Sequence, residues 1–177
     1  MNTANIFVEL VVIGSGAAVW LGLLLATIFG FPLRWPEDDP GLVVAIPLLS
    51  VAYVLGVLVD RVADGLVGWV ARRRGFASTE EHAKARVIVY TKAPILRDLF
   101  EYSRSRLRIC RGWVLNSAIL LVTFDAFALT RITTHRATAV VVGTLGFLLA
   151  AVAAVYGWRS LLRQEQRRLE QQRKLVA

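Results

Sequence analysis

Apolar residues run along the chain in four long stretches separated by polar segments. Residues 10–31 and 137–158 carry no charge, and residues 42–59 are also uncharged. Residues 112–129 contain one charged side chain, Asp125. A helix needs about 20 apolar residues to cross the roughly 30 Å hydrocarbon core of a bilayer. The pattern predicts four transmembrane helices, at about residues 8–31, 42–62, 112–131 and 137–158.

Composition supports this prediction. Of the 177 residues, 56% are hydrophobic and 19% are charged, whereas soluble domains are about a quarter charged. The single cysteine, Cys110, excludes an intrachain disulfide, and the two distant histidines, His82 and His135, argue against a Cys/His zinc site. We therefore expect no metal and no cofactor. No Lys or Arg precedes the first apolar run, which predicts a retained span rather than a signal peptide.

The basic residues predict how the protein is oriented. Of 21 Lys and Arg, twelve lie within residues 61–111 and six within the tail 159–177, against three in the other two loops. Lys and Arg gather on the cytoplasmic side of membrane proteins. Both termini and the central basic segment are therefore predicted to be cytoplasmic, facing an anionic inner leaflet.

The predicted helices continue beyond the membrane. No helix breaker separates span two from the arginines at 72–74, and residues 72–111 are predicted to be a cytoplasmic helical segment. Within it, Pro94 suits the first turn of a helix that runs into span three. The tail 159–177 has neither Gly nor Pro and extends span four. The predicted fold is an all-α integral membrane protein, a single domain over residues 1–177, with spans two, three and four extended into the cytoplasm.

Span one carries small residues at steps of four, which place them on one face of a helix. Small side chains let helix backbones approach closely in lipid. Two interpretations are open: packing within one four-helix subunit, or packing between subunits. The residues are Gly14, Ala18, Gly22, Ala26 and Gly30.

A group of opposite charges is predicted where spans two and three meet the inner interface. Asp60 and Asp64 are neighbours one helical turn apart, so they would repel each other if unpaired. The basic start of span three lies at the same depth. One interpretation is a structural ion-pair cluster, and the other is a gate or ligand site at which an intracellular anion competes for the arginines. The span-three candidates are Glu101, Arg104, Arg108 and Arg111.

Asp125 is the charge most clearly placed inside a span. Ionisable residues at that depth are costly and usually face a bundle interior, a partner or water. Asp125 is therefore a candidate pathway residue, with a hydrogen-bonded structural acid as the alternative. Asn116 and Thr123 are further polar candidates on the same span.

Three consecutive acids, Glu37, Asp38 and Asp39, lie in the predicted outer loop between two prolines. In an oligomer, a ring of such loops would concentrate cations at the mouth of a pore. The alternative is an ordinary solvated turn.

The run 101–109, followed by Gly112, Trp113 and Asn116, resembles the entry to a span in small bacterial membrane proteins. The size, span number and basic cytoplasmic face resemble the small multi-pass effectors of bacterial anti-phage defence systems. That resemblance implies depolarisation of the inner membrane after release by a nucleotide or nucleic-acid signal. It assigns no functional residue in this chain.

The sequence lacks a glycine-rich phosphate loop, a nucleophile elbow and an HExxH motif, so it does not favour an enzyme. The leading hypothesis is a homo-oligomeric ion channel or regulated pore, gated through its basic helices by an anionic ligand such as a nucleotide or nucleic acid. The competing hypothesis is a non-conducting scaffold or regulatory subunit that docks a cytoplasmic protein. A small intramembrane enzyme is a third hypothesis.

Overall fold

A computed structural model describes residues 3–30, 41–73 and 94–176. In these residues the chain forms four helices and no strand, which confirms the predicted all-α class. The helices are α1 (Thr3–Phe29), α2 (Gly41–Arg73), α4 (Pro94–Arg131) and α5 (Arg136–Val176).

Each of the four helices contains a segment long and apolar enough to cross a membrane. These segments are Ala4–Phe29, Val44–Val70, Arg104–Arg131 and Arg136–Gln164. Helices α4 and α5 are longer than their apolar segments, with 38 and 41 residues. Helix α4 begins at Pro94, where a missing backbone N–H costs nothing because the first turn has no partner for it.

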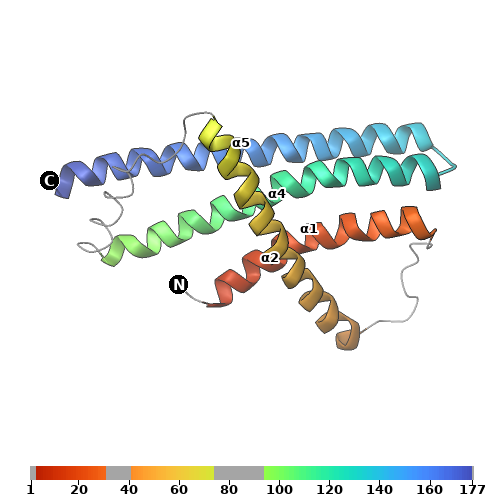
Figure 1. Ribbon diagram of the computed structural model, residues 1–177, viewed down its shortest axis with the longest axis horizontal. Helices are drawn as coiled ribbons and strands as arrows, with labels where there is room; N and C mark the ends of the chain where they lie inside the picture. The colour runs from red at the N-terminus through yellow and green to blue at the C-terminus, as the bar shows by residue number, and fades with distance from the viewer. Residues whose placement is uncertain (1–2, 31–40, 74–93, 177) are drawn as a thin grey trace.

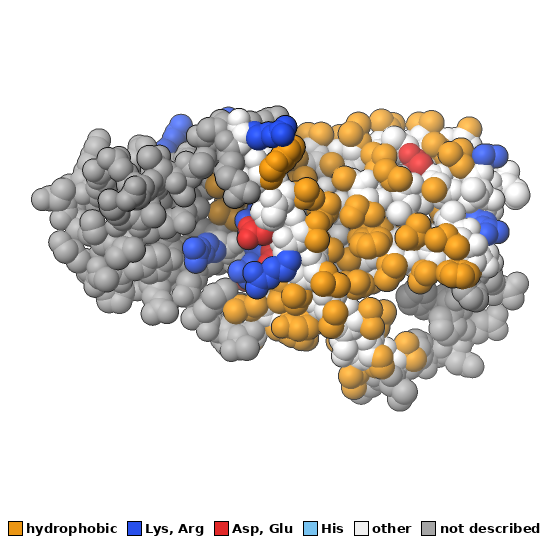
Figure 2. Space-filling view, in the orientation of Figure 1, with side chains coloured by type: hydrophobic (Ala, Val, Ile, Leu, Met, Phe, Trp, Pro, Cys, Tyr) orange, Lys and Arg blue, Asp and Glu red, His pale blue; other side chains and the backbone are white. Residues whose placement is uncertain are grey.

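The helices form an open row rather than a closed bundle. Helices α1, α4 and α5 lie side by side with α4 between the other two, and α2 crosses α1 and α4 obliquely (Figure 1). Among the described residues, α5 packs against α4 alone. Much of the apolar surface is consequently exposed, and most described charged side chains lie at the edges of the apolar band in Figure 2.

Two glycines allow α1 and α2 to cross with their backbones in direct contact. A Cβ atom at Gly14 would overlap the carbonyl oxygen of Ala52, and one at Gly56 would overlap the carbonyl oxygen of Leu10. Phe7 and Tyr53 stack beside the crossing with ring centroids 5.3 Å apart. The crossing therefore depends on glycine in both helices.

The ends of α1 and α4 are joined by an arginine. Gly30 adopts a φ of 72°, a left-handed conformation that ends a helix at little cost for glycine. Arg131 donates a hydrogen bond of 2.7 Å from Nη2 to the carbonyl oxygen of Thr27 in the last turn of α1. The positive charge of Arg131 is also stabilised by the helix dipole, which is negative at the C-terminal end of α1.

Candidate functional site: polar contacts between the spans

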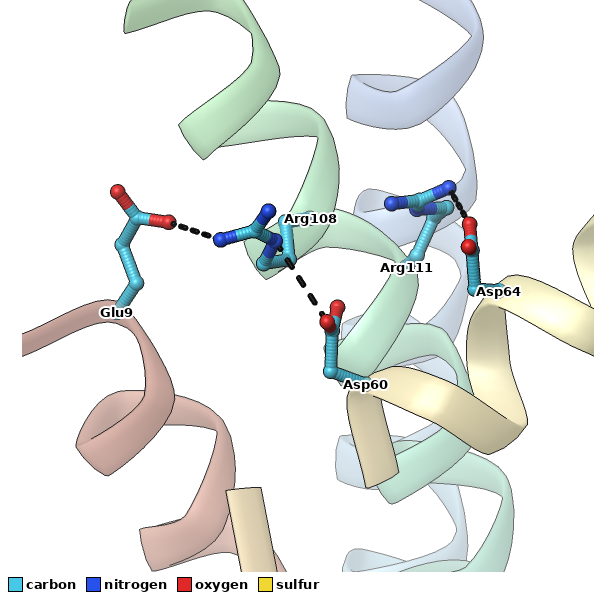
Figure 3. Close-up of polar contacts among 5 residues, drawn as sticks. All are labelled: Glu9, Asp60, Asp64, Arg108 and Arg111. Atoms are coloured by element: carbon cyan, nitrogen blue, oxygen red, sulfur yellow. Dashed lines mark hydrogen bonds and ion pairs between the residues drawn. The ribbon is translucent and has the colours of Figure 1, made fainter. Parts of the chain in front are cut away.

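Arg108 joins three helices through two carboxylates. Its Nη1 lies 3.4 Å from Oε2 of Glu9 on α1, and its Nε lies 3.6 Å from Oδ2 of Asp60 on α2. Figure 3 shows the guanidinium of Arg108 between these two acids. Because Glu9 is 4% exposed, its charge needs a partner, and Arg108 supplies one.

A second ion pair extends this contact along α2 and α4. Nη1 of Arg111 contacts Oδ1 of Asp64, one turn beyond Asp60 (Figure 3). Together these residues form what we call the three-helix charge cluster: Glu9, Asp60, Asp64, Arg108 and Arg111. Oδ1 of Asp60 and Nε of Arg111 are buried without a hydrogen-bond partner in the described part of the chain. The cluster therefore has one hydrogen-bond acceptor and one donor unused.

The structure thus brings together four of the six predicted members of the charge group. Arg104 has an exposed side chain and takes no part in the described ion pairs. The side chain of Glu101 lies outside the described residues. Glu9 was not predicted as a member. Its position near the start of the first apolar segment matches the predicted depth of Arg108, but sequence spacing does not reveal which helix faces α1.

Asn116 joins α1 to α4 within the apolar core. It is completely buried, and its Nδ2 donates a hydrogen bond of 2.7 Å to the carbonyl oxygen of Ile13. Its Oδ1 accepts a 3.2 Å hydrogen bond from the indole N–H of Trp20. A Cβ atom at Gly16 would lie 2.7 Å from Asn116 Nδ2, so Gly16 provides the space for this side chain. Both described side-chain hydrogen bonds of Asn116 run to α1 of the same chain.

The hydroxyl of Thr123 also has hydrogen-bond partners, both in its own helix. Its hydroxyl lies 2.9 Å from the carbonyl oxygen of Ile119 and 3.4 Å from that of Leu120. The residue is 7% exposed. Neither Asn116 nor Thr123 therefore presents a free polar group in the described structure.

Asp125 faces α5 and is half-buried. The hydroxyl of Thr144 lies 3.0 Å from Oδ1 and 3.1 Å from Oδ2 of this carboxylate. No Lys, Arg or His of the described residues forms an ion pair with it. Asp125 is consequently a carboxylate inside an apolar segment, with one neutral hydroxyl as its described partner. The sequence identified Asp125 but offered no reason to pair it with Thr144.

The small residues of span one do not share one environment. Gly14 contacts α2, Ala26 is 2% exposed, and Gly30 ends the helix beside Arg131. Ala18 is half-buried. Nothing lies within 4 Å of a Cβ atom built at Gly22. Packing within the subunit therefore explains part of the stripe and leaves the surface at Gly22 open.

The predicted acidic mouth, Glu37, Asp38 and Asp39, lies outside the described residues. No group of three or more His, Cys, Asp or Glu side chains that could hold a metal ion occurs in the ranges that the structure describes.

Comparison with known proteins gives no match: no family model fits the chain, and no curated protein or solved structure is significantly similar to it.

Proposed function

We propose that the protein is a homo-oligomeric ion channel or regulated pore of a bacterial inner membrane, with Asp125 facing its permeation path. The observation that carries the proposal is the state of Asp125, a carboxylate in an apolar segment that has a neutral hydroxyl and no described cation beside it. Carboxylates in this setting serve as transient partners for permeating cations.

The open row of helices supports an oligomer. In the described residues α5 packs against α4 alone and the row does not surround a path, so the walls of a path would come from several copies. The open space at Gly22 and the exposed apolar side chains of α5 are both available for contact between copies. Small residues favour such contacts in lipid.

The three-helix charge cluster supports regulation at the cytoplasmic side. Arg108 and Arg111 already hold carboxylates, so an anionic ligand such as a nucleotide or nucleic acid would have to compete with Asp60 and Asp64. Displacing those acids would release α2 from α4. Arg111 Nε, which is buried without a described partner, gives such an anion a further hydrogen-bond donor once Asp64 is displaced.

Two substitutions separate a pathway role of Asp125 from a structural one. Asp125→Asn keeps an oxygen that accepts the Thr144 hydrogen bond but removes the charge. Thr144→Val removes the hydrogen bond but keeps the charge. If Asp125 faces a path, Asp125→Asn lowers cation flux or cation preference in liposomes while thermal stability in detergent is retained, and Thr144→Val leaves the preference intact.

The opposite pattern contradicts the proposal. If Thr144→Val lowers the melting temperature while Asp125→Asn leaves flux per assembled protein and ion selectivity at the wild-type level, Asp125 is a structural acid. Absence of flux from liposomes that contain only the assembled wild-type protein would reject conduction altogether.

A non-conducting scaffold is the second candidate. It is favoured by the contacts of Asn116 and Arg108, which fix α1, α2 and α4 to one another. It is also favoured by the extension of α4 and α5 beyond their apolar segments, which offers surfaces to a cytoplasmic protein. The same liposome measurement separates the two candidates.

A further inference from the structure

Asp125 is isolated from other titratable groups along the row of helices. It is the single titratable side chain of α4 between Arg111 and Arg131. The apolar stretches of the two helices that lie beside α4 have none, over residues 10–29 of α1 and 137–155 of α5. A cation that binds to a charged side chain in this part of the three helices therefore binds to Asp125.

The charged and titratable groups on either side of this stretch are placed elsewhere. Arg131 is six residues, about 9 Å, further along α4 and donates a hydrogen bond to the carbonyl oxygen of Thr27. Arg111, in the three-helix charge cluster, is 14 residues or about 21 Å away in the other direction. On α2, Tyr53 stacks on an aromatic ring of α1. Two groups are exposed at the turn before α5, His135 and Arg136.

The hydroxyl of Thr144 is a partner that suits both charge states of Asp125. The hydroxyls of Thr27, Thr123 and Thr130 bond to carbonyl oxygens of their own helices, whereas the described hydrogen bonds of Thr144 run to the two carboxylate oxygens of Asp125. A hydroxyl can donate to a carboxylate and can also accept from a protonated carboxyl, whereas Lys and Arg can only donate. Thr144 can therefore stay bonded to Asp125 when a proton binds and when it leaves.

The oxygen atoms at this site suit a proton better than a metal cation. Ca²⁺ takes about 6–8 oxygen ligands and Mg²⁺ about six, and K⁺ filters surround the ion with rings of carbonyl oxygens. The described residues offer two carboxylate oxygens and one hydroxyl. The neighbouring contact between α4 and α5 is apolar, with Phe124 and Phe147 packed edge to face. A proton needs one oxygen and cancels a charge that is costly in hydrocarbon.

We propose that the ion that Asp125 binds during permeation is H⁺. The carboxylate takes up a proton from one side of the membrane, becomes a neutral carboxyl bonded to Thr144, and releases the proton toward the other side. Only an O–H bond forms and breaks, so the step needs no oxidant or reductant. The inference rests on the proposed function, whose permeating cation it narrows to the proton.

Proton flux and metal-cation flux are compared in liposomes that contain only the assembled protein. With K⁺ inside, Na⁺ outside and valinomycin to make the lumen negative, an entrapped pH dye should report acidification by wild type. A Na⁺ dye under the same conditions, and a K⁺ electrode without valinomycin, should report no more flux than protein-free liposomes. Flux of Na⁺ or K⁺ above that level overturns the inference and leaves the channel standing. Absence of all three fluxes rejects the proposed function and the inference with it.

Variants assign the proton to Asp125. Asp125→Asn should lower acidification to the level of protein-free liposomes, and Asp125→Glu should retain it because a carboxyl group is still present. Thr144→Val is the matched control, since it keeps the carboxyl and should keep the preference for H⁺ over Na⁺. Wild-type acidification by Asp125→Asn overturns the assignment.

Infrared difference spectra between low and high pH give a readout that does not depend on flux. Wild type should show a band from a protonated carboxyl that is missing from Asp125→Asn and shifted in frequency in Asp125→Glu. If Asp125→Asn does not assemble, the comparison of wild type with Asp125→Glu decides. Identical carboxyl bands in wild type and in the assembled variants overturn the proposal.

Discussion

Asn116 shows how one side chain can fix two spans. It donates to a backbone carbonyl of α1 and accepts from an indole of the same helix, and it has no exposed surface. Interhelical hydrogen bonds in membranes contribute on average about 0.6 kcal/mol and at most about 1.7 kcal/mol each.

We predict that Asn116→Leu destabilises the protein by about 1–3 kcal/mol, because two hydrogen bonds are lost and the Trp20 N–H is left unpaired. The melting temperature in detergent measures the effect. Ser117→Ala is the control. It shortens the buried side chain next to Asn116, whose hydroxyl has no described protein partner, so the melting temperature should not fall. If Asn116→Leu melts at the wild-type temperature, the two hydrogen bonds do not hold α1 to α4.

The sequence marks unusual residues more readily than it pairs them. Asn116, Asp125 and the acids of α2 stand out because polar groups in apolar segments are costly. The partners of Asn116 and Asp125, Trp20 and Thr144, do not stand out to the same degree, and neither does Glu9, the second acid that contacts Arg108. Trp20 lies 96 residues from Asn116 along the chain, and no local periodicity links residues that far apart.

At the scale of helices, the crossing of α1 and α2 depends on glycine because the two backbones touch. We predict that Gly14→Ala destabilises the protein by about 1–3 kcal/mol, the usual cost of overpacking a closely packed contact. Gly22→Ala adds the same methyl group where nothing lies within 4 Å, so it should leave the melting temperature unchanged or slightly raised.

Equal melting temperatures for the two variants would mean that α1 and α2 do not meet at Gly14. If Gly22→Ala instead lowers the oligomer mass in detergent without changing the subunit's stability, that surface belongs to an interface between copies.

Helix identity follows from the sequence because an apolar run of spanning length has few alternatives in lipid. The start of α4 at Pro94 is likewise local chemistry. The oblique course of α2, in contrast, is not determined by its local sequence. Gly14 and Gly56 lie on different helices, and the angle between those helices is set only when the two glycines meet the opposite backbones.

At the scale of the molecule, the polar contacts are distributed by depth. The three-helix charge cluster holds one end of the row, Asn116 its middle, and Arg131 joins α1 to α4 at the other end. Helix α5 shares in none of these contacts and is linked to α4 by the Asp125–Thr144 hydrogen bond and by apolar packing. Helix α5 is therefore the helix with the fewest described polar contacts to its neighbours.

Charge predicts how this row of helices is oriented if its apolar segments cross a membrane. In a Cys110→Ser background, single cysteines at Gln171 and Thr133 report the two sides, because Thr133 is exposed in the turn between α4 and α5. Lys and Arg favour the cytoplasmic side, with 18 on the predicted inner segments and three on the outer ones. In intact spheroplasts, an impermeant maleimide should label Thr133→Cys and spare Gln171→Cys until the membrane is permeabilised. Labelling of Gln171→Cys alone would show the opposite orientation, with Trp113 and the charge cluster in the outer half of the membrane.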